Sequence, residues 1–232
     1  MTGTIINVIT VLVGGGIGLL FGARIPERFK STIIAGLGWF TAAMGLQMFL
    51  KSENPLIVLG ALLIGALLGE WWRIEDGLQS LGQALEKRFS REEERSGSRF
   101  VRGFMVASLL FCVGPMTILG SIQDGLTGDY SLLAVKSTLD GFASIAFAST
   151  LGIGVLFSSL VVFVFQGGIS LMAGQLSAVI SDPMLNEMTA AGGVILLGLA
   201  VSNLLEIKKI RMGNFLPALA VAPLIMWVAG KF

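Results

Sequence analysis

The sequence predicts an all-α fold, a polytopic transmembrane helix bundle of about eight spans, and three observations support this prediction. Hydrophobic residues make up 54% of the 232 residues and charged residues only 13%, whereas a soluble domain carries about 25% charged residues. The apolar residues occur in runs of about 20, the length needed to cross a hydrocarbon core about 30 Å thick. Lysines and arginines gather in alternate loops. A soluble globular protein is therefore excluded.

Eight apolar runs follow one another along the chain. They cover residues 3–23, 32–50, 55–72, 103–121, two spans within 132–180, 188–205 and 215–229. The first run precedes Arg24, the first charged residue, so it is interpreted as a true span and not as a signal peptide, which begins with basic residues. The run 132–180 is too long for one helix, and we expect a break between Gly152 and Leu160. Because this boundary is the least defined, seven spans remain an alternative.

The basic residues predict the orientation of the spans, because cytoplasmic loops are enriched in Lys and Arg. They follow the first span, fill the segment between the third and the fourth, and follow the seventh. They are Arg24, Arg28, Lys30, Arg73, Lys87, Arg88, Arg91, Arg95, Arg99, Arg102, Lys208, Lys209 and Arg211. With eight spans, all of these loops lie on the cytoplasmic side, so both termini are predicted to lie outside.

The longest polar segment, residues 73–99, is predicted to be a cytoplasmic amphipathic connector within a single integral membrane domain of residues 1–232. Its apolar residues recur three or four positions apart, as on one face of a helix; they are Ile74, Leu78, Leu81, Leu85 and Phe89. Such a helix lies on the membrane surface. Ser90 and Glu93 have the spacing of a capping box, which favours the start of a second short helix.

The composition excludes several kinds of chemistry. With no His and one Cys, the chain has no Ser-His-Asp or Cys-His site, no thiolate zinc cluster and no internal disulfide. A net charge of +1 gives no reason to expect a nucleic-acid partner. We therefore expect no cofactor other than an ion such as Na⁺ and no resident metal site. An intramembrane enzyme that uses Asp124 and Asp140 as a carboxylate pair is the least favoured alternative, because neither acid lies in a recognisable catalytic motif, so we expect no enzyme activity.

The first span carries a polar residue on a face of small residues. Asn7 shares this face with Gly14, Gly18 and Gly22, a spacing that lets another helix approach closely. This stripe suits an internal contact or a homodimer equally well. Asn7 is expected to point at protein or at a cavity, because an amide facing lipid is costly.

The fifth span contains an acid. Ser137, Asp140 and Ser144 share one face, and an acidic residue inside a membrane marks a functional site by default. The alternative is an interfacial acid whose partner is the neighbouring Lys136.

The fourth span contains a break near the middle of the bilayer. Gly114 and Pro115 interrupt the helix, because proline lacks an N–H group and clashes with the preceding turn. Thr117, Ser121 and Asp124 then follow on one face. Freed carbonyls, hydroxyls and a carboxylate are hard oxygen ligands that suit a small cation. The alternative is a simple proline kink.

Three further polar residues form a candidate outer or inner vestibule. Glu187 opens the seventh span, whereas Glu70 and Asn203 end the third and the seventh, where an interfacial position is favoured. Shifting the chain by 133 residues places Asn7 on Asp140 and Glu70 on Asn203, since 140 − 7 = 203 − 70. A parallel repeat of four spans plus four would explain this match and would bring Asn7 and Asp140 face to face.

Four segments resemble the YqgA-like family of bacterial inner-membrane proteins. They are GTIINVITVLVGGGIG, FCVGPMTILGSIQDGLTGD, DGFASIAFASTLGIGV and NEMTAAGGVILLGL. The resemblance covers essentially the whole chain and implies a multi-pass protein of the bacterial inner membrane. The activity suggested for that family is a sodium channel or pump.

These observations favour a membrane transport protein. We expect gradient-driven or passive translocation of a small cation, Na⁺ ahead of H⁺, or of a small solute coupled to that cation. The alternative is a non-transporting scaffold or partner subunit that acts through helix faces and the cytoplasmic connector. The expected partners are the lipid bilayer and the small cation or solute.

Overall fold

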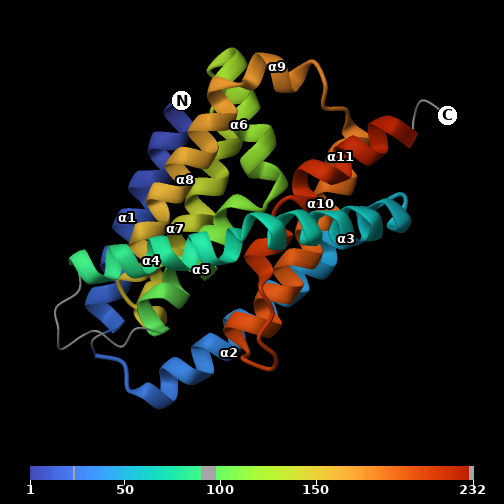
Figure 1. Ribbon diagram of the computed structural model, residues 1–232. Coiled ribbons are helices and arrows are strands. Elements are labelled where there is room, and N and C mark those ends of the chain that lie inside the picture. Colours follow the sequence, from blue (N-terminus) through green and yellow to red (C-terminus); the bar gives the residue numbers. More distant parts are fainter. Residues whose placement is uncertain (23, 90–97, 230–232) are drawn as a thin grey trace. The chain divides into compact units, whose positions relative to one another are not determined.

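The computed structural model describes residues 1–22, 24–89 and 98–229, which form helices joined by loops, with no strand among them (Figure 1). Seven of the described helices are long and apolar enough to cross a membrane, and one bent pair would add an eighth span. The predicted fold class is therefore confirmed. The short helix predicted from Ser90 and Glu93 lies outside the described residues.

The helices are numbered in chain order. They are α1 Thr2–Gly22, α2 Glu27–Phe49, α3 Pro55–Trp72, α4 Ile74–Phe89, α5 Ser98–Cys112, α6 Pro115–Thr127, α7 Ser131–Leu151, α8 Gly154–Leu171, α9 Ala173–Ser177, α10 Asp182–Leu199, the π-helical turn η2 Ala200–Leu204, the 3₁₀ turn η3 Met212–Phe215, and α11 Ala218–Ala229.

Several boundaries differ from expectation. The second span begins at Glu27 and not at residue 32, and the fourth extends from Ser98 to Thr127. The break predicted at Gly114 and Pro115 is present, since α5 and α6 meet there at an angle of 62°. The seventh span begins at Asp182 and not at residue 188. Proline is favourable in the first turn of a helix. Pro183 lies in the first turn of α10, and Ser181, at the N-cap, has an extended backbone. The break between α7 and α8 falls at Gly152, as expected, where a φ of 84° suits glycine.

The chain divides into two compact units, and α2, α4 and α6 contribute residues to both, α6 only its first residue to the second unit. The first unit contains Met1–Ile34, Gln79–Cys112 and Met116–Ser177. The second unit contains Ala35–Leu78, Val113–Pro115 and Ala178–Phe232. Each is described by itself.

In the first unit, α1 packs along α7 through its glycine face. A Cβ atom added at Gly14 would lie 2.3 Å from the Gly141 carbonyl oxygen. One added at Gly18 would lie 2.4 Å from that of Ile145. The contacted residues of α7 rise in residue number as the glycines of α1 do, so α1 and α7 are parallel. The glycine stripe is therefore used in close packing within the chain.

In the first unit, α8 packs against α1 and against the α5–α6 segment. This helix runs antiparallel to α1, since a Cβ on Gly15 would meet Leu156, whereas one on Gly167 would meet Met1. The α5–α6 segment runs in the same direction as α8. Its contacts with α8 progress from Gly154 beside Phe100 at one end to Ser170 beside Gly125 at the other.

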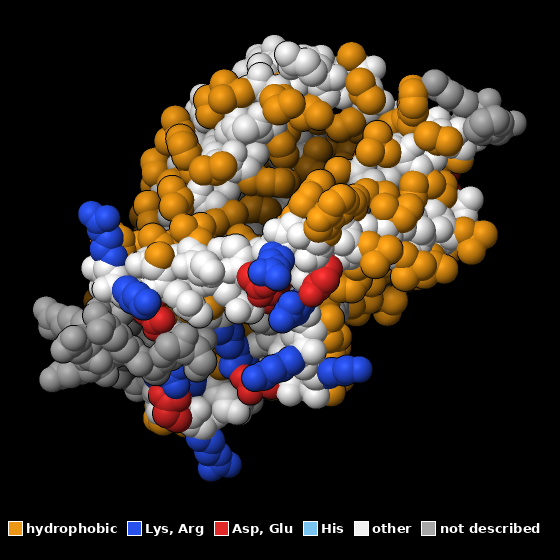
Figure 2. Space-filling view, in the orientation of Figure 1, with side chains coloured by type: hydrophobic (Ala, Val, Ile, Leu, Met, Phe, Trp, Pro, Cys, Tyr) orange, Lys and Arg blue, Asp and Glu red, His pale blue; other side chains and the backbone are white. Residues whose placement is uncertain are grey.

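In the second unit, small residues let α3, α10 and α11 form one core. Its fully buried members are Val58, Ala61, Ala190, Ala191, Ala218 and Ala222. On the outer helix faces large apolar side chains are exposed, among them Leu67 at 73% and Trp71 at 80%. Figure 2 shows apolar side chains over most of the visible helix surfaces and charged ones around α4. Exposed apolar faces of this kind suit contact with lipid.

Candidate functional site

The acid of the fifth span lies in a buried polar group between α1 and α7. The Asn7 amide nitrogen donates a hydrogen bond of 3.0 Å to Asp140 Oδ2, and the Lys136 ammonium forms an ion pair with the same oxygen. The exposed fractions of Asn7, Lys136 and Asp140 are 0%, 5% and 8%. The acid therefore has the partner that the alternative interpretation named, but the pair is buried in the protein.

Several oxygens beside this pair are left without partners. Asn7 Oδ1 and Ser144 Oγ are buried and have no hydrogen-bond partner among the described residues. Ser144 lies one helical turn beyond Asp140 on the predicted face. One turn before Asn7, Thr4 Oγ1 is also buried and has no hydrogen-bond partner among the described residues. The sequence reasoning did not include Thr4, although its spacing from Asn7 places it on the same face.

Phe111, near the C-terminal end of α5, lies close to the ion pair within the first unit. Thr117, near the start of α6, donates its hydroxyl hydrogen to the Phe111 carbonyl at 3.0 Å, which gives that carbonyl a partner after α5 ends. The Lys136 ammonium lies 5.9 Å from the centroid of the Phe111 ring, a cation–π distance. Asn7, Thr117 and Asp140, which were predicted in the first, fourth and fifth spans, therefore all lie in the first unit.

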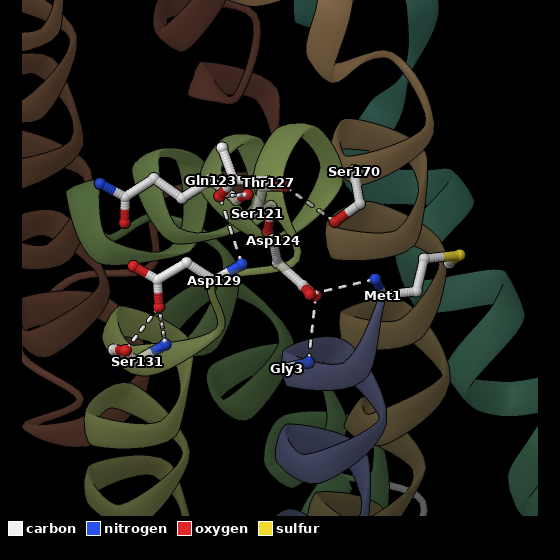
Figure 3. A network of polar contacts seen from close by, with 9 residues as sticks. All are labelled: Met1, Gly3, Ser121, Gln123, Asp124, Thr127, Asp129, Ser131 and Ser170. Carbon is white, nitrogen blue, oxygen red and sulfur yellow. Dashed lines mark hydrogen bonds and ion pairs between the residues drawn. The ribbon is translucent and has the colours of Figure 1, made fainter.

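Asp124 binds the beginning of α1 (Figure 3). Its carboxylate accepts a hydrogen bond of 3.0 Å from the Gly3 N–H and pairs with the Met1 amino group at 3.1 Å. A carboxylate at a helix N-terminus is stabilised by the helix dipole. This acid therefore has a structural role at the end of α1.

The two oxygens of Ser121 in α6 differ in their hydrogen bonding. Its carbonyl accepts a hydrogen bond of 2.9 Å from the Ser170 hydroxyl of α8, as Figure 3 shows. Its own hydroxyl is buried and has no partner among the described residues.

Gln166 of α8 is a buried polar residue that the sequence reasoning missed. Its side chain is fully buried, and neither its amide nitrogen nor its amide oxygen has a hydrogen-bond partner among the described residues. A polar group buried without partners is costly and calls for an explanation. The signal was present, because Gln166 is the one amide within the apolar run 154–171.

The remaining predicted residues belong to the second unit, together with Gly114 and Pro115. Glu187 is fully buried and accepts hydrogen bonds from the Ser52 hydroxyl at 2.7 Å and from the Glu53 and Asn54 N–H groups at 2.8 and 2.9 Å. Glu187 therefore links α10 by hydrogen bonds to residues 52–54, which precede α3.

The other two vestibule candidates lie at helix ends. Glu70 has an exposed side chain that pairs with Arg211 at 3.0 Å and accepts a hydrogen bond from the Asn214 amide. Asn203 lies within the π-helical turn η2.

The separation of 133 residues recurs in both units. It relates Asn7 to Asp140 in the first unit and Asn54 to Glu187 in the second, and each pair is hydrogen bonded. Glu53 and Asn186 form a third such pair. In each unit these contacts join positions that the predicted repeat makes equivalent.

Comparison with known proteins places this architecture in a family. Residues 2–227 match the model of a family described as "Protein of unknown function (DUF554)". The chain is 33% identical to the "Uncharacterized membrane protein YdfK" of Bacillus subtilis (strain 168), over 100% of this chain and 98% of that protein. It is 32% identical to the "Uncharacterized protein YqgA" of Escherichia coli (strain K12), over 95% of this chain and 94% of that protein. No solved structure matches.

Proposed function

The chain belongs to the DUF554 family, and from the polar group in its first unit we propose that this membrane protein translocates a small cation, or a small solute coupled to one. The observation that carries the proposal is the buried Asp140–Lys136 pair, which lies beside a broken helix and beside oxygens without partners. Broken helices next to intramembrane charges are how many secondary transporters build their binding sites.

A purely structural role explains this group poorly. A buried ion pair gives little net stability, since the cost of removing two charges from water offsets their attraction. Both members of the pair lie on α7, and apolar residues at these two positions would pack against the neighbouring helices equally well. Charged residues inside a membrane protein are expensive and generally belong to pathways for ions, protons or substrates.

In this proposal the Lys136 ammonium is a tethered cation that occupies Asp140 when no transported ion is bound. An incoming Na⁺ takes its place on the Asp140 carboxylate and gains Asn7 Oδ1 and Ser144 Oγ as neutral ligands. Carboxylate, amide and hydroxyl oxygens are the ligands that hard cations prefer. Na⁺ is placed ahead of H⁺ because a proton would use only the carboxylate and leave these two oxygens without partners.

Flux through purified protein in liposomes tests the proposal. Wild-type protein is expected to take up ²²Na⁺ along an imposed Na⁺ gradient, and Asp140→Asn is expected to reduce this uptake to that of empty liposomes. The matched control is Asp129→Asn, because Asp129 lies in the loop between α6 and α7 and bonds Ser131 there. Unchanged uptake in Asp140→Asn overturns the assignment of the site. Absence of ion flux in wild-type protein favours the scaffold alternative.

A further inference from the structure

Two side chains from different helices approach the first turn of α6, and together they indicate a second ligand. The first is Gln166, which lies one helical turn before Ser170 on the same face of α8. Ser170 donates its hydroxyl hydrogen to the Ser121 carbonyl in the middle of α6. Because the α5–α6 segment and α8 run in the same direction, Gln166 lies on the face of α8 that contacts α6, on the side toward the start of α6.

The second side chain is Lys136. Leu133, one turn before it on α7, packs against Gly120 of α6, where an added Cβ would lie 2.9 Å from the Leu133 side chain. The Lys136 ammonium reaches the ring of Phe111, the last residue but one of α5. It therefore lies where α5 ends and α6 begins.

The first turn of α6 is itself rich in donors. This helix has 13 residues and begins at Pro115, so the following N–H groups, those of Met116, Thr117 and Ile118, have no acceptor within the helix. The helix dipole adds partial positive charge at this end. The C-terminal end of α5 carries carbonyl groups with partial negative charge. One of them, the Phe111 carbonyl, accepts a hydrogen bond from the Thr117 hydroxyl.

We propose that a small monocarboxylate binds at the first turn of α6, held by the backbone N–H groups of that turn, by the Gln166 amide and by the Lys136 ammonium. The inference rests on the proposed function and names its solute. Gln166 supports it independently of the helix end, because its buried amide has no partner among the described residues and lies on the face of α8 whose Ser170 contacts α6. A carboxylate carries one negative charge, which the single charge of Lys136 balances. A doubly charged anion would leave a buried charge uncompensated.

The same lysine couples the two ligands. While Asp140 is free of cations, it holds the Lys136 ammonium. When Na⁺ occupies Asp140, Lys136 is released and its charge becomes available to the carboxylate. Na⁺ and the carboxylate must then bind cooperatively, and each raises the affinity for the other by the same factor.

Thermal unfolding of the purified full-length protein tests this inference. The probes are acetate, propionate and lactate, with sulfate and phosphate as other anions, each added with Na⁺ or with N-methylglucamine at constant chloride. A ligand that binds the folded state raises its Tm. A monocarboxylate is expected to raise the Tm in Na⁺ and to have no effect in N-methylglucamine.

Variants of Gln166 separate this site from the cation site. Gln166→Leu is expected to keep the Na⁺-dependent rise in Tm and to weaken carboxylate binding about tenfold or more, because a hydrogen bond to a charged group is lost. The matched control is Gln123→Leu, on an exposed position of α6, which should retain both responses. If Gln166→Leu does not fold, Gln166→Glu keeps the size of the side chain and should still abolish the carboxylate response.

The outcomes distinguish the two proposals. A Na⁺ response in wild-type protein without any carboxylate response overturns this inference and leaves the proposed function standing. An equal response to sulfate or phosphate overturns the monocarboxylate class. A carboxylate affinity that is unchanged in Gln166→Leu, or a carboxylate response that survives in Gln166→Glu, overturns the location. A response to carboxylate but not to Na⁺ contradicts the proposed function and the coupling that rests on it.

Discussion

Asn7 and Asp140 lie 133 residues apart in the chain and are joined by a hydrogen bond of 3.0 Å between their side chains. The bond joins two parallel helices at a point where both residues are buried, and it uses only the donor of the Asn7 amide. The acceptor of that amide stays without a partner among the described residues. This contact therefore both fixes the orientation of Asp140 and presents a spare oxygen next to it.

Replacing Asn7 should weaken cation binding without preventing folding. Asn7→Ala removes one neutral ligand and the hydrogen bond to Asp140, and we expect the apparent affinity for Na⁺ to fall about tenfold, since a hydrogen bond to a charged group contributes about 1.5–3 kcal/mol. Na⁺-dependent uptake into liposomes measures it. Asn186→Ala is the control, because that amide lies in the second unit and bonds Glu53. An affinity unchanged in Asn7→Ala would remove Asn7 from the ion site.

The Lys136–Asp140 pair should show strong coupling in stability. Lys136→Met leaves the buried Asp140 charge unpaired, so we expect a loss of about 3–5 kcal/mol in the absence of Na⁺. The double variant Lys136→Met/Asp140→Leu should recover most of that loss, because apolar replacement of a buried pair is nearly neutral. Chemical unfolding of the four proteins in the double-mutant cycle measures the coupling.

Sodium gives this cycle a second readout. High Na⁺ should partly restore Lys136→Met, because the ion takes the place of the missing ammonium. It should not affect the double variant. Additive losses across the cycle, or restoration of the double variant by Na⁺, would argue against the displacement of Lys136 by a cation.

The glycine face of α1 offers a matched pair of substitutions. Gly14→Ala places a Cβ 2.3 Å from the Gly141 carbonyl oxygen, whereas a Cβ at Gly16 meets nothing within 4 Å. Gly14→Ala should therefore destabilise the protein by about 1–3 kcal/mol through overpacking, whereas Gly16→Ala should be neutral or slightly stabilising. Unfolding in detergent tests the difference. Equal stability of the two variants would mean that α1 and α7 are not in this close contact.

Glu187 should affect stability and not ion binding. Its carboxylate accepts three hydrogen bonds in the second unit, and Glu187→Gln replaces one of the accepting oxygens by a donor. We expect a loss of about 1–3 kcal/mol, the usual cost of leaving a buried group unsatisfied, together with an unchanged Na⁺-dependent rise in Tm. Glu53→Gln is the control on an exposed residue. Loss of the Na⁺ response in Glu187→Gln would instead assign this residue to the ion site.

Much of the fold could be predicted from apolar run length and from helix breakers. The third span was predicted with its observed ends, 55–72, because Asn54 and Pro55 mark a helix start and the polar residues after Trp72 mark its end. The start of α10 at Asp182 was missed, since the polar residues there looked like loop, although serine followed by Asp-Pro is a helix-start signal.

The candidate site was predictable only in part. Face sharing within a helix identified Asp140 and Ser144, and the repeat spacing identified Asn7 as the partner of Asp140. Which helices become neighbours cannot be read from one helix alone. For that reason the interaction of Asp124 with the start of α1 and the position of Gln166 beside α6 were not foreseen.

The central claim is that Asp140 binds a cation in competition with Lys136, and ion-dependent thermal stabilisation tests it most directly. The Tm of wild-type protein and of Asp140→Asn is measured at constant ionic strength across Na⁺, Li⁺, K⁺ and pH. We predict that Na⁺ stabilises wild-type protein, by about 2.7 kcal/mol when its concentration is 100 times the Kd, and that Asp140→Asn shows no such response. Equal stabilisation of both proteins by Na⁺, or no response of wild-type protein to any of these cations, would contradict the account.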